Sequence, residues 1–396
     1  MIDTLEIIGR KRELFTEDVN KFSKKLDEII TKSKFLIIGA AGSIGQAVAK
    51  ELFKRNPLTL HCVDISENNL VELVRDLRSS IGYIGGDFKT FAVDAGSIEF
   101  KALMEKEGPY DYFFNLSALK HVRSEKDPYT LMRMTEVNII NTIKSLNIAK
   151  EMKAKKYFCV STDKAAYPIN MMGASKYIME MFLTKESLSQ KISMARFANV
   201  AFSDGSLLHG FNQRIYKRQP FSIPQDIKRY FITSSEAGEL CLLSCLLGLN
   251  REIFFSKPNK DLKLTSLIDV AHKYLIKKGY EPYKCSSEDE ARKKIEELIN
   301  IKKWPCYFFK SDTTGEKKFE EFFTSDECID TSKFKNIGII KKNHEIENEV
   351  LERFLVSINN LKKKGIWTKN DLLKIYFELL PKFNHQEKNK YLDEKM

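Results

Sequence analysis

Cysteine is scarce in this 396-residue sequence, and its spacing matches no common metal or disulfide motif. The seven cysteines include no Cys-x-x-Cys pair. Cys62 and Cys159 lie within apolar runs of the kind that form buried strands. An odd, scattered set of cysteines is typical of reduced thiols. We therefore expect no disulfide framework, no metal site and a cytoplasmic location.

Long apolar segments are also absent. The longest nearly apolar run, Leu240–Leu249, is too short to cross a bilayer, and the first residues, MIDTLEIIGRKREL, lack the apolar centre of a secretion signal. Hydrophobic residues at 43% and charged residues at 30% are typical of a globular protein. We expect no membrane partner, and the length is sufficient for two lobes.

Acidic residues are outnumbered by basic ones, and the formal net charge is +11. This excess raises the possibility of a nucleic-acid partner. However, the lysines are spread over amphipathic helical patterns, and no basic cluster is interleaved with aromatic residues. We expect a solvated, lysine-rich surface and no nucleic-acid partner, and such a surface also suits a small polyanionic substrate.

Short apolar runs alternate with helical patterns over the first half of the chain. This order of buried strands and helices predicts an α/β fold, a Rossmann-type doubly wound parallel sheet, with a smaller mixed α/β substrate lobe. The predicted strands are residues 35–38, 58–63, 88–93, 110–115, 157–160 and 193–197, and the helices are 44–55, 68–78, 98–105, 129–152 and 173–188.

Four segments follow from this pattern. The alternation weakens beyond Asn199, where helices are expected at 236–249, 264–278 and 287–301. The apolar residues of the first 33 positions recur at helical spacing, and such a stripe must be buried, so we expect a homo-oligomer. The segments are an N-terminal helical extension (1–33), a dinucleotide-binding domain (34–200), a substrate lobe (201–345) and a C-terminal helical segment (346–396).

A glycine-rich turn follows the first predicted strand. In GAAGSIG, the glycines Gly39, Gly42 and Gly45 have the G-x-x-G-x-x-G spacing, and Ser43 and Ile44 begin a helical pattern. The first glycine permits a tight turn, the second lets the backbone approach a pyrophosphate, and the third lets helix and strand pack closely. The phosphates then lie at the helix N-terminus. This context predicts dinucleotide binding.

Acidic residues end the next two strands. A carboxylate at Asp64 can accept hydrogen bonds from the adenosine ribose hydroxyls and would repel a 2′-phosphate. No arginine lies beside it in VDISENNL. We therefore expect NAD rather than NADP. Asp94 is expected beside the adenine, and a helix N-cap role is its alternative.

An acid and an amine stand together after the fifth predicted strand. The segment STDKAAYPINMMGASK places Asp163 beside Lys164, and Lys176 follows at the start of a helical pattern. Acid-base chemistry requires groups that give and take protons within one pocket. The ends of parallel strands present such groups to the crevice of an α/β sheet. A surface pair that caps a turn is the alternative.

Taken in order, the motifs GAAGSIG, VDIS, FNLSALKHV and STDKAAYPINMMGASK resemble those of extended short-chain dehydrogenase/reductases. Within them the chain is similar to UDP-N-acetylglucosamine 4,6-dehydratases of polysaccharide biosynthesis. The resemblance extends from about Lys34 to Lys342 through RFANVAFSDGSLL, KRYFITSSEA, REIFFSKPN and GEKKFEEF. It implies NAD-binding roles for further residues around these motifs, namely Ile65, Ser66, Ala95, Leu116, Ser117, Ala118, Lys120 and Ser161.

The resemblance also implies a reaction. NAD⁺ takes a hydride from carbon 4 of a UDP-sugar, and the resulting ketone acidifies the proton at carbon 5. Lys164 is then the base that removes this proton, Asp163 protonates the departing carbon-6 hydroxyl, and the hydride returns to carbon 6. Desolvation in a closed site lowers the pKa of an amine and raises that of a carboxylic acid, whereas a tight ion pair opposes both shifts.

One departure concerns the tyrosine of the superfamily's Tyr-x-x-x-Lys motif. Lys176 matches the lysine, which binds the nicotinamide ribose, but Met172 occupies the tyrosine position. A thioether transfers no proton. Thr162, Asp163 or a water molecule are the candidates for accepting the carbon-4 hydroxyl proton, and Tyr167 is a weaker one.

Substrate contacts are implied in the same way. Lys120 and His121 are expected near the reacting sugar, Asn170 and Asn199 on the sugar and diphosphate, Arg229 on the diphosphate and Glu316 on the uridine ribose. A second family arginine is replaced by Thr313, and residues 287–301 look like an insertion. Two alternatives stay open: a dehydratase that also inverts carbon 5, and a non-catalytic NAD-binding regulator.

Overall fold

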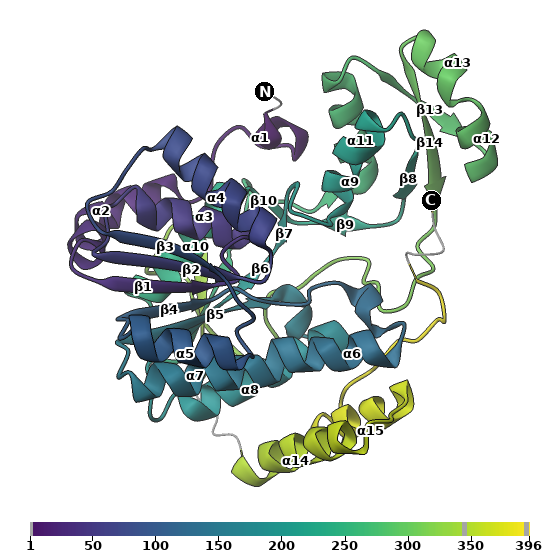
Figure 1. The fold of residues 1–396 in the computed structure, drawn as a ribbon. Helices are drawn as coiled ribbons and strands as arrows, with labels where there is room; N and C mark the ends of the chain where they lie inside the picture. The colour runs from purple at the N-terminus through teal and green to yellow at the C-terminus, as the bar shows by residue number, and fades with distance from the viewer. Residues whose placement is uncertain (1–2, 343–346, 392–395) are drawn as a thin grey trace.

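The computed structural model describes residues 3–342, 347–391 and 396. Its larger lobe is built on a nine-stranded sheet with the order β15-β16-β11-β6-β5-β4-β1-β2-β3 (Figure 1). The seven strands from β11 to β3 are parallel, and β16 and β15 extend the sheet in antiparallel pairing. The strands are β1 (Lys34–Ile38), β2 (Thr59–Asp64), β3 (Asp87–Ala92), β4 (Tyr112–Asn115), β5 (Lys156–Thr162), β6 (Ile192–Phe197), β11 (Glu252–Ser256), β15 (Cys328–Asp330) and β16 (Ile337–Lys341).

Helices cover both faces of this sheet, so the doubly wound fold predicted from the sequence is confirmed (Figure 1). On one face, α3 packs against α10, and α10 also contacts α2. On the other face, α8 packs on β5 and on the long helix that contains a π-helical turn at Glu136–Ile140. The helices of this lobe are α2 (Thr16–Ile30), α3 (Ser43–Phe53), α4 (Glu67–Ser80), α5 (Ile98–Glu107), α6 (Pro128–Thr135), α7 (Asn141–Glu151), α8 (Met171–Glu186) and α10 (Ser234–Leu247).

The strand order places the crevice between β1 and β4. Ile38 at the end of β1 pairs with Val63 of β2 on one side and with Asn115 of β4 on the other. The chain leaves β1 and β4 toward opposite faces, and ligands of open α/β sheets bind at such a switch point. The predicted glycine turn and the Asp163–Lys164 pair both lie at this edge.

A second lobe contains a three-stranded parallel sheet with the order β13-β14-β8 and an aromatic core. The stacked rings of Phe211 and Phe221, whose centroids are 4.5 Å apart, lie beside Tyr274 and Trp304. Its elements are β8 (Phe221–Pro224), α9 (Leu207–Tyr216), α11 (Leu267–Lys277), β13 (Glu281–Cys285), α12 (Glu288–Lys293), α13 (Ile295–Asn300) and β14 (Lys303–Phe309). Two short pairs, β7 (Asn199–Val200) with β10 (Phe231–Ile232) and β9 (Lys228–Arg229) with β12 (Thr265–Ser266), connect the lobes.

The predicted substrate lobe, residues 201–345, is only partly correct. The strands β11, β15 and β16 belong to the large sheet, because the fully buried apolar strand EIFFS of β11 pairs with β6. The apolar helix α10 likewise packs on α3. The helix predicted at 287–301 is divided into α12 and α13.

Both terminal segments pack on the rest of the chain. The apolar stripe of the N-terminal arm, including Leu14, Leu26 and Ile30, is buried within the same molecule. The argument for a homo-oligomer therefore loses its premise, and the oligomer stays a prediction. At the other end, α14 (Asn348–Lys364) and α15 (Lys369–Leu379) lie under α8 and α6, where Tyr376 is hydrogen bonded to Thr135 at 2.9 Å (Figure 1).

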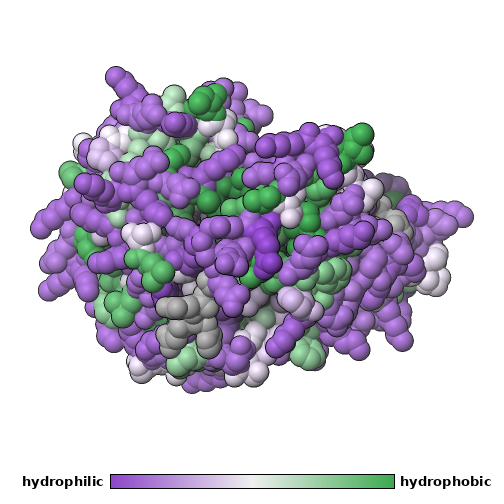
Figure 2. Space-filling view, turned by 90° about the horizontal axis from the view of Figure 1, so that it is seen from below, coloured by the Kyte–Doolittle hydropathy of each residue, from purple (hydrophilic) through white to green (hydrophobic). Residues whose placement is uncertain are grey.

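The surface agrees with the solvated character expected from composition. Figure 2 shows one face, and hydrophilic residues cover most of it, with smaller apolar patches between them. Within residues 3–342 and 347–391, no helix combines the length and apolar character needed to span a bilayer.

Candidate active site

The glycine turn between β1 and α3 leaves an open surface at its centre. Gly39 has φ of +79°, and a Cβ there would lie 2.6 Å from the backbone nitrogen of Ser117. A Cβ on Gly45 would lie 2.1 Å from the carbonyl oxygen of Gly39. A Cβ on Gly42, in contrast, would meet only Gly39 O at 3.7 Å. Gly39 and Gly45 are therefore required by the fold, whereas the fold alone does not require glycine at position 42.

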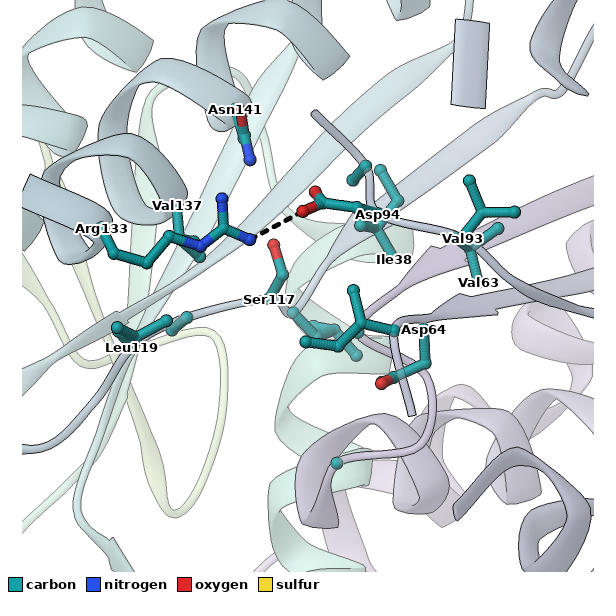
Figure 3. Close-up of a pocket in the computed structure, with 16 residues that line it drawn as sticks. Ile38, Val63, Asp64, Val93, Asp94, Ser117, Leu119, Arg133, Val137 and Asn141 are labelled. Carbon is teal, nitrogen blue, oxygen red and sulfur yellow. Dashed lines mark hydrogen bonds and ion pairs between the residues drawn. The ribbon is translucent and has the colours of Figure 1, made fainter. Parts of the chain in front are cut away.

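A cavity of about 230 Å³ extends from this turn toward the ends of β2 and β3 (Figure 3). Asp64 lines it, and its carboxylate accepts hydrogen bonds from the backbone nitrogens of Ala41 and Ser66, both at 2.9 Å. The predicted cofactor residues found in its wall are Gly39, Gly42, Asp64, Ile65, Asp94, Ala95, Leu116, Ser117 and Ala118. Ser66 is outside the wall and caps α4.

Arg133 is a residue of this cavity that the sequence did not indicate. Its guanidinium donates to Asp94 at 2.7 Å, and Figure 3 shows this pair across the cavity from Asp64. Asp94 also accepts from the backbone nitrogen of Gly96 at 2.8 Å, while Ser97 caps α5 itself. The alternative of Asp94 as the helix cap is therefore wrong.

A second cavity of about 340 Å³ shares Gly39 and Gly42 with the first. It is bounded by the ends of β4, β5 and β6, so the switch point opens into it. Its wall brings together most of the predicted reaction and sugar residues, namely Lys120, His121, Thr162, Asp163, Lys164, Met172, Lys176 and Asn199, together with the predicted cofactor residue Ser161. Ser43, Ile44 and Gly45 complete it on the side of α3.

Asp163 and Lys164 form an ion pair here, together with a carboxylate that the sequence did not assign. Lys164 Nζ lies 3.2 Å from Asp163 Oδ1 and 2.6 Å from Glu320 Oε1. Thr162 Oγ1 donates to Asp163 Oδ1 at 2.6 Å. Asp163 and Glu320 are both buried, and no described residue hydrogen bonds to Asp163 Oδ2. Two carboxyl groups therefore share one amine.

This geometry reverses the pKa shifts expected from desolvation. Burial alone would lower the pKa of Lys164, but the carboxylates of Asp163 and Glu320 hold it above its ordinary value. Burial alone would raise the pKa of Asp163, but Lys164 and hydrogen bonding hold it below its ordinary value. Burial and the neighbouring Asp163 raise the pKa of Glu320 to about 7. Of the two opposing effects weighed from the sequence, ion pairing rather than desolvation therefore sets the direction of the pKa shift at Asp163 and at Lys164.

Lys176 has a different environment. It is buried, burial lowers the pKa of its amine, and the side-chain contact of Nζ is the thioether of Met179 at 3.3 Å. Met172 lies in the same wall. The hydroxyl of Tyr167 instead accepts from the backbone of Ser325 at 2.8 Å, and Tyr167 is not among the wall residues. Tyr167 is therefore poorly placed to replace the missing tyrosine.

Arg229, Glu316 and Asn170 lie outside the wall of this cavity. The guanidinium of Arg229 is hydrogen bonded to Glu316, and its Nε lies 3.1 Å from Glu320 Oε1. The amide of Asn170 caps α8 through the backbone nitrogen of Gly173 at 2.8 Å and donates to Gly315 O at 2.9 Å. Asn170 thus joins the loop after β5 to the Gly-Glu-Lys segment rather than pointing to a sugar.

The C-terminal tail crosses beside these segments and was not anticipated. The backbone nitrogen of Gln386 donates to Ile169 O at 2.9 Å, and Gln386 O accepts from the backbone nitrogen of Gly315 at 3.0 Å. His385 Nε2 lies 3.3 Å from Glu125, whose carboxylate also accepts from the backbone of Met171. The tail therefore connects the loop after β5 with the Gly-Glu-Lys segment that contains Gly315 and Glu316.

The family model described as polysaccharide biosynthesis protein matches residues 35–342. The chain belongs to this family. The resemblance drawn from the glycine turn and the Ser-Thr-Asp-Lys motif is therefore confirmed as far as the family is concerned. Glu320 lies within GEKKFEEF, a segment that carried the resemblance, so its neighbourhood was recognisable although its role was not.

Two curated relatives cover most of the chain. It is 30% identical over 333 residues to an uncharacterized membrane protein of Methanocaldococcus jannaschii, which covers 82% of this chain and 88% of that protein. It is 28% identical over 342 residues to the capsular polysaccharide biosynthesis protein CapD of Staphylococcus aureus. That alignment covers 85% of this chain but 53% of CapD, so the chain spans about half the length of that relative.

Solved structures share the fold. Pen from Bacillus thuringiensis has a TM-score of 0.65 at 20% identity, with 83% of this chain and 98% of that chain covered. DesIV from Streptomyces venezuelae, a dTDP-glucose 4,6-dehydratase solved with NAD and TYD bound, has a TM-score of 0.53 at 14% identity, with 73% and 87% covered. At these identities the likeness establishes the Rossmann-type fold.

Proposed function

We propose that this protein is an NAD-dependent UDP-sugar 4,6-dehydratase that acts on UDP-N-acetylglucosamine. The observation that carries the proposal is the Asp163–Lys164 pair in the wall of a cavity that also contains Lys176 and the glycine turn. An acid and an amine beside a nicotinamide site suit elimination of water, whereas simple hydride transfer needs no second acid-base pair.

The residues present fit NAD. The turn offers the open backbone at Gly42 and the N-terminus of α3, which has no side-chain cap, to a pyrophosphate. Asp64 lines the cavity in which the adenosine ribose would lie. The buried amine of Lys176 has no hydrogen bond to a carboxylate within the described chain, so it can donate to the hydroxyls of the nicotinamide ribose. When bound, NAD supplies the hydride acceptor and donor.

Each side chain then has a task. Lys164 removes the carbon-5 proton. Asp163 accepts the carbon-4 hydroxyl proton and then donates it to the departing carbon-6 oxygen, so it ends the cycle as a carboxylate. Thr162 orients Asp163 through its 2.6 Å hydrogen bond. Arg229 pairs with the diphosphate once it leaves Glu316, and Lys120 and His121 face the sugar. A family named for polysaccharide biosynthesis and a dehydratase among proteins of the same fold support this assignment.

Incubation of the purified protein with NAD and UDP-N-acetylglucosamine tests the proposal. We expect a 4-keto product that has lost one water molecule, detected by mass spectrometry and NMR. A product inverted at carbon 5 would favour the epimerising dehydratase, and NAD binding without any turnover of UDP-sugars would favour a regulator. Cytoplasmic location and homo-oligomerisation stay predictions from the sequence.

A further inference from the structure

Glu320 is buried between the groups assigned to proton transfer and the group assigned to the diphosphate. Its Oε1 accepts a hydrogen bond from Lys164 Nζ at 2.6 Å, and its Oε2 accepts one from Asn199 Nδ2 at 2.7 Å. Arg229 Nε lies 3.1 Å from Oε1. Only 4% of the residue is exposed. Glu320 thus contacts both the proposed base and the proposed phosphate-binding arginine.

The ion pair creates a chemical difficulty for the proposed reaction. Lys164 can remove a carbon-5 proton only as a neutral amine, yet both neighbouring carboxylates favour its ammonium form. A proton acceptor in contact with Nζ is therefore needed. Asp163 is a weak acceptor because its pKa is held low, whereas the pKa of Glu320 is raised to about 7.

We propose that Glu320 activates Lys164 by accepting one proton from its ammonium group before carbon 5 is deprotonated. The inference rests on the dehydratase function proposed above. One N–H bond of Lys164 breaks and one O–H bond forms on Glu320, which leaves an amine beside a carboxylic acid. The amine takes the carbon-5 proton and later gives a proton back to the sugar. Glu320 then returns its proton to Lys164, so protons balance over the cycle.

Substrate binding would promote this transfer through Arg229. A diphosphate that pairs with the guanidinium of Arg229 neutralises its positive charge beside Glu320. The proton affinity of the Glu320 carboxylate then rises. Closure of the site around a sugar also excludes water, which favours a neutral pair over an ion pair. The charged and titratable groups around Glu320 are Asp163, Lys164, Arg229, Tyr230 and Lys317.

The test compares Glu320→Gln with Glu321→Gln. Glutamine keeps the size of residue 320 and one acceptor oxygen, for Lys164 or for Asn199, but accepts no proton. Glu321 is an exposed neighbour that loses the same charge. For the wild type and Glu321→Gln, kcat should fall as the pH drops below about 7, because Glu320 becomes protonated. For Glu320→Gln, kcat at neutral pH should be at least about 10²-fold lower. The kcat of Glu320→Gln should rise about tenfold for each unit of increasing pH, because solvent must then deprotonate Lys164.

Glu320→Asp separates the proton role from a structural one. It keeps a carboxyl group, so we expect part of the rate and the fall of kcat near pH 7 to return. Wild-type rate and pH profile in Glu320→Gln would overturn the inference. A loss of equal size at every pH would also overturn it, because it would indicate a purely structural role.

A second measurement does not depend on turnover. Calorimetric titration with UDP, in buffers of different ionisation enthalpy, should show proton uptake for the wild type and Glu321→Gln near neutral pH, and none for Glu320→Gln. Binding of UDP to the wild type without proton uptake would refute the role of Glu320 and leave the proposed function standing. Failure of the wild type to bind UDP would instead refute the proposed function.

Discussion

Arg229 and Glu316, which the sequence assigns to two parts of one substrate, are hydrogen bonded to each other. The guanidinium is also close to Glu320, so it is surrounded by carboxylates before a diphosphate arrives. Binding of a nucleotide diphosphate therefore exchanges one set of anionic partners for another. The affinity gained at Arg229 is the difference between these two sets, not the full strength of an arginine–phosphate contact.

Arg229→Ala should weaken binding of UDP. Hydrogen bonds to charged groups contribute about 1.5–3 kcal/mol, and because Arg229 gives up carboxylate partners we expect the lower end, roughly tenfold in Kd. Titration calorimetry with UDP measures this. Lys228→Ala removes a neighbouring exposed charge and serves as the control. If both variants bind UDP like the wild type, Arg229 does not contact the diphosphate.

Asp64→Asn should reduce the preference for NAD over NADP. Asparagine has the size of aspartate but lacks the negative charge that repels a 2′-phosphate at this end of the cavity. Fluorescence titration of both nucleotides against both proteins gives the ratio of affinities. We expect strong NAD preference in the wild type and a smaller ratio in the variant. Equal affinity of the wild type for NAD and NADP would contradict the role given to Asp64.

Gly42→Ala should weaken NAD binding without a loss of stability, whereas Gly39→Ala should reduce the stability of the fold. A Cβ on Gly42 makes only an ordinary contact of 3.7 Å, so the variant should melt like the wild type but bind NAD at least about tenfold more weakly. Gly39→Ala places a Cβ 2.6 Å from Ser117 N at a positive φ, so it should lose more than about 1–3 kcal/mol of stability. Thermal unfolding and NAD titration distinguish the two. Unchanged NAD affinity in Gly42→Ala would exclude close approach of a ligand there.

Lys164→Ala should abolish dehydration without abolishing NAD binding. Loss of a positioned base costs about 10²–10⁴-fold in rate, and deuterium incorporation at carbon 5 should disappear with it. Asp163→Asn should release no water from carbon 6. Met172→Leu should be mild, because no proton is transferred by that side chain. Near wild-type dehydration by Lys164→Ala would place the base elsewhere.

The sequence predicted the strands β1 to β6 of the central sheet because most of them are short, apolar and buried, whereas β11, β15 and β16 were not predicted as strands of this sheet. In β5, for example, all residues except Thr162 are buried, and the apolar run is visible without a structure. The glycine turn was equally accessible, since Gly39 and Gly45 are imposed by local sterics. These features depend on residues that are close in sequence or on the general burial of apolar strands. Both can be inferred from the pattern of apolar residues and glycines in the sequence.

The environment of Lys164 could not be predicted in the same way. Glu320 is 156 positions further along the chain, and its contact with Lys164 depends on how the second lobe returns to the sheet. The carboxylates of Asp163 and Glu320 together hold the pKa of Lys164 above its ordinary value, and only Asp163 is its neighbour in sequence. The Asn170 side chain was similarly assigned to a sugar, although its amide is used by Gly173 and Gly315.

Gln386→Pro tests whether the C-terminal tail supports the substrate side of the site. The backbone nitrogen of Gln386 donates to Ile169 O at 2.9 Å, in the loop that carries the Asp163–Lys164 pair, and proline has no such donor. Gln386→Ala keeps the donor and serves as the matched control. Because the tail also contacts Gly315 beside Glu316, we expect weaker UDP binding and slower turnover in the proline variant, by several-fold each. NAD affinity should be unchanged, since the glycine turn lies away from the tail. Equal behaviour of the proline and alanine variants in UDP titration and product assays would show that this hydrogen bond is dispensable, and the tail would then be a surface attachment without influence on the site.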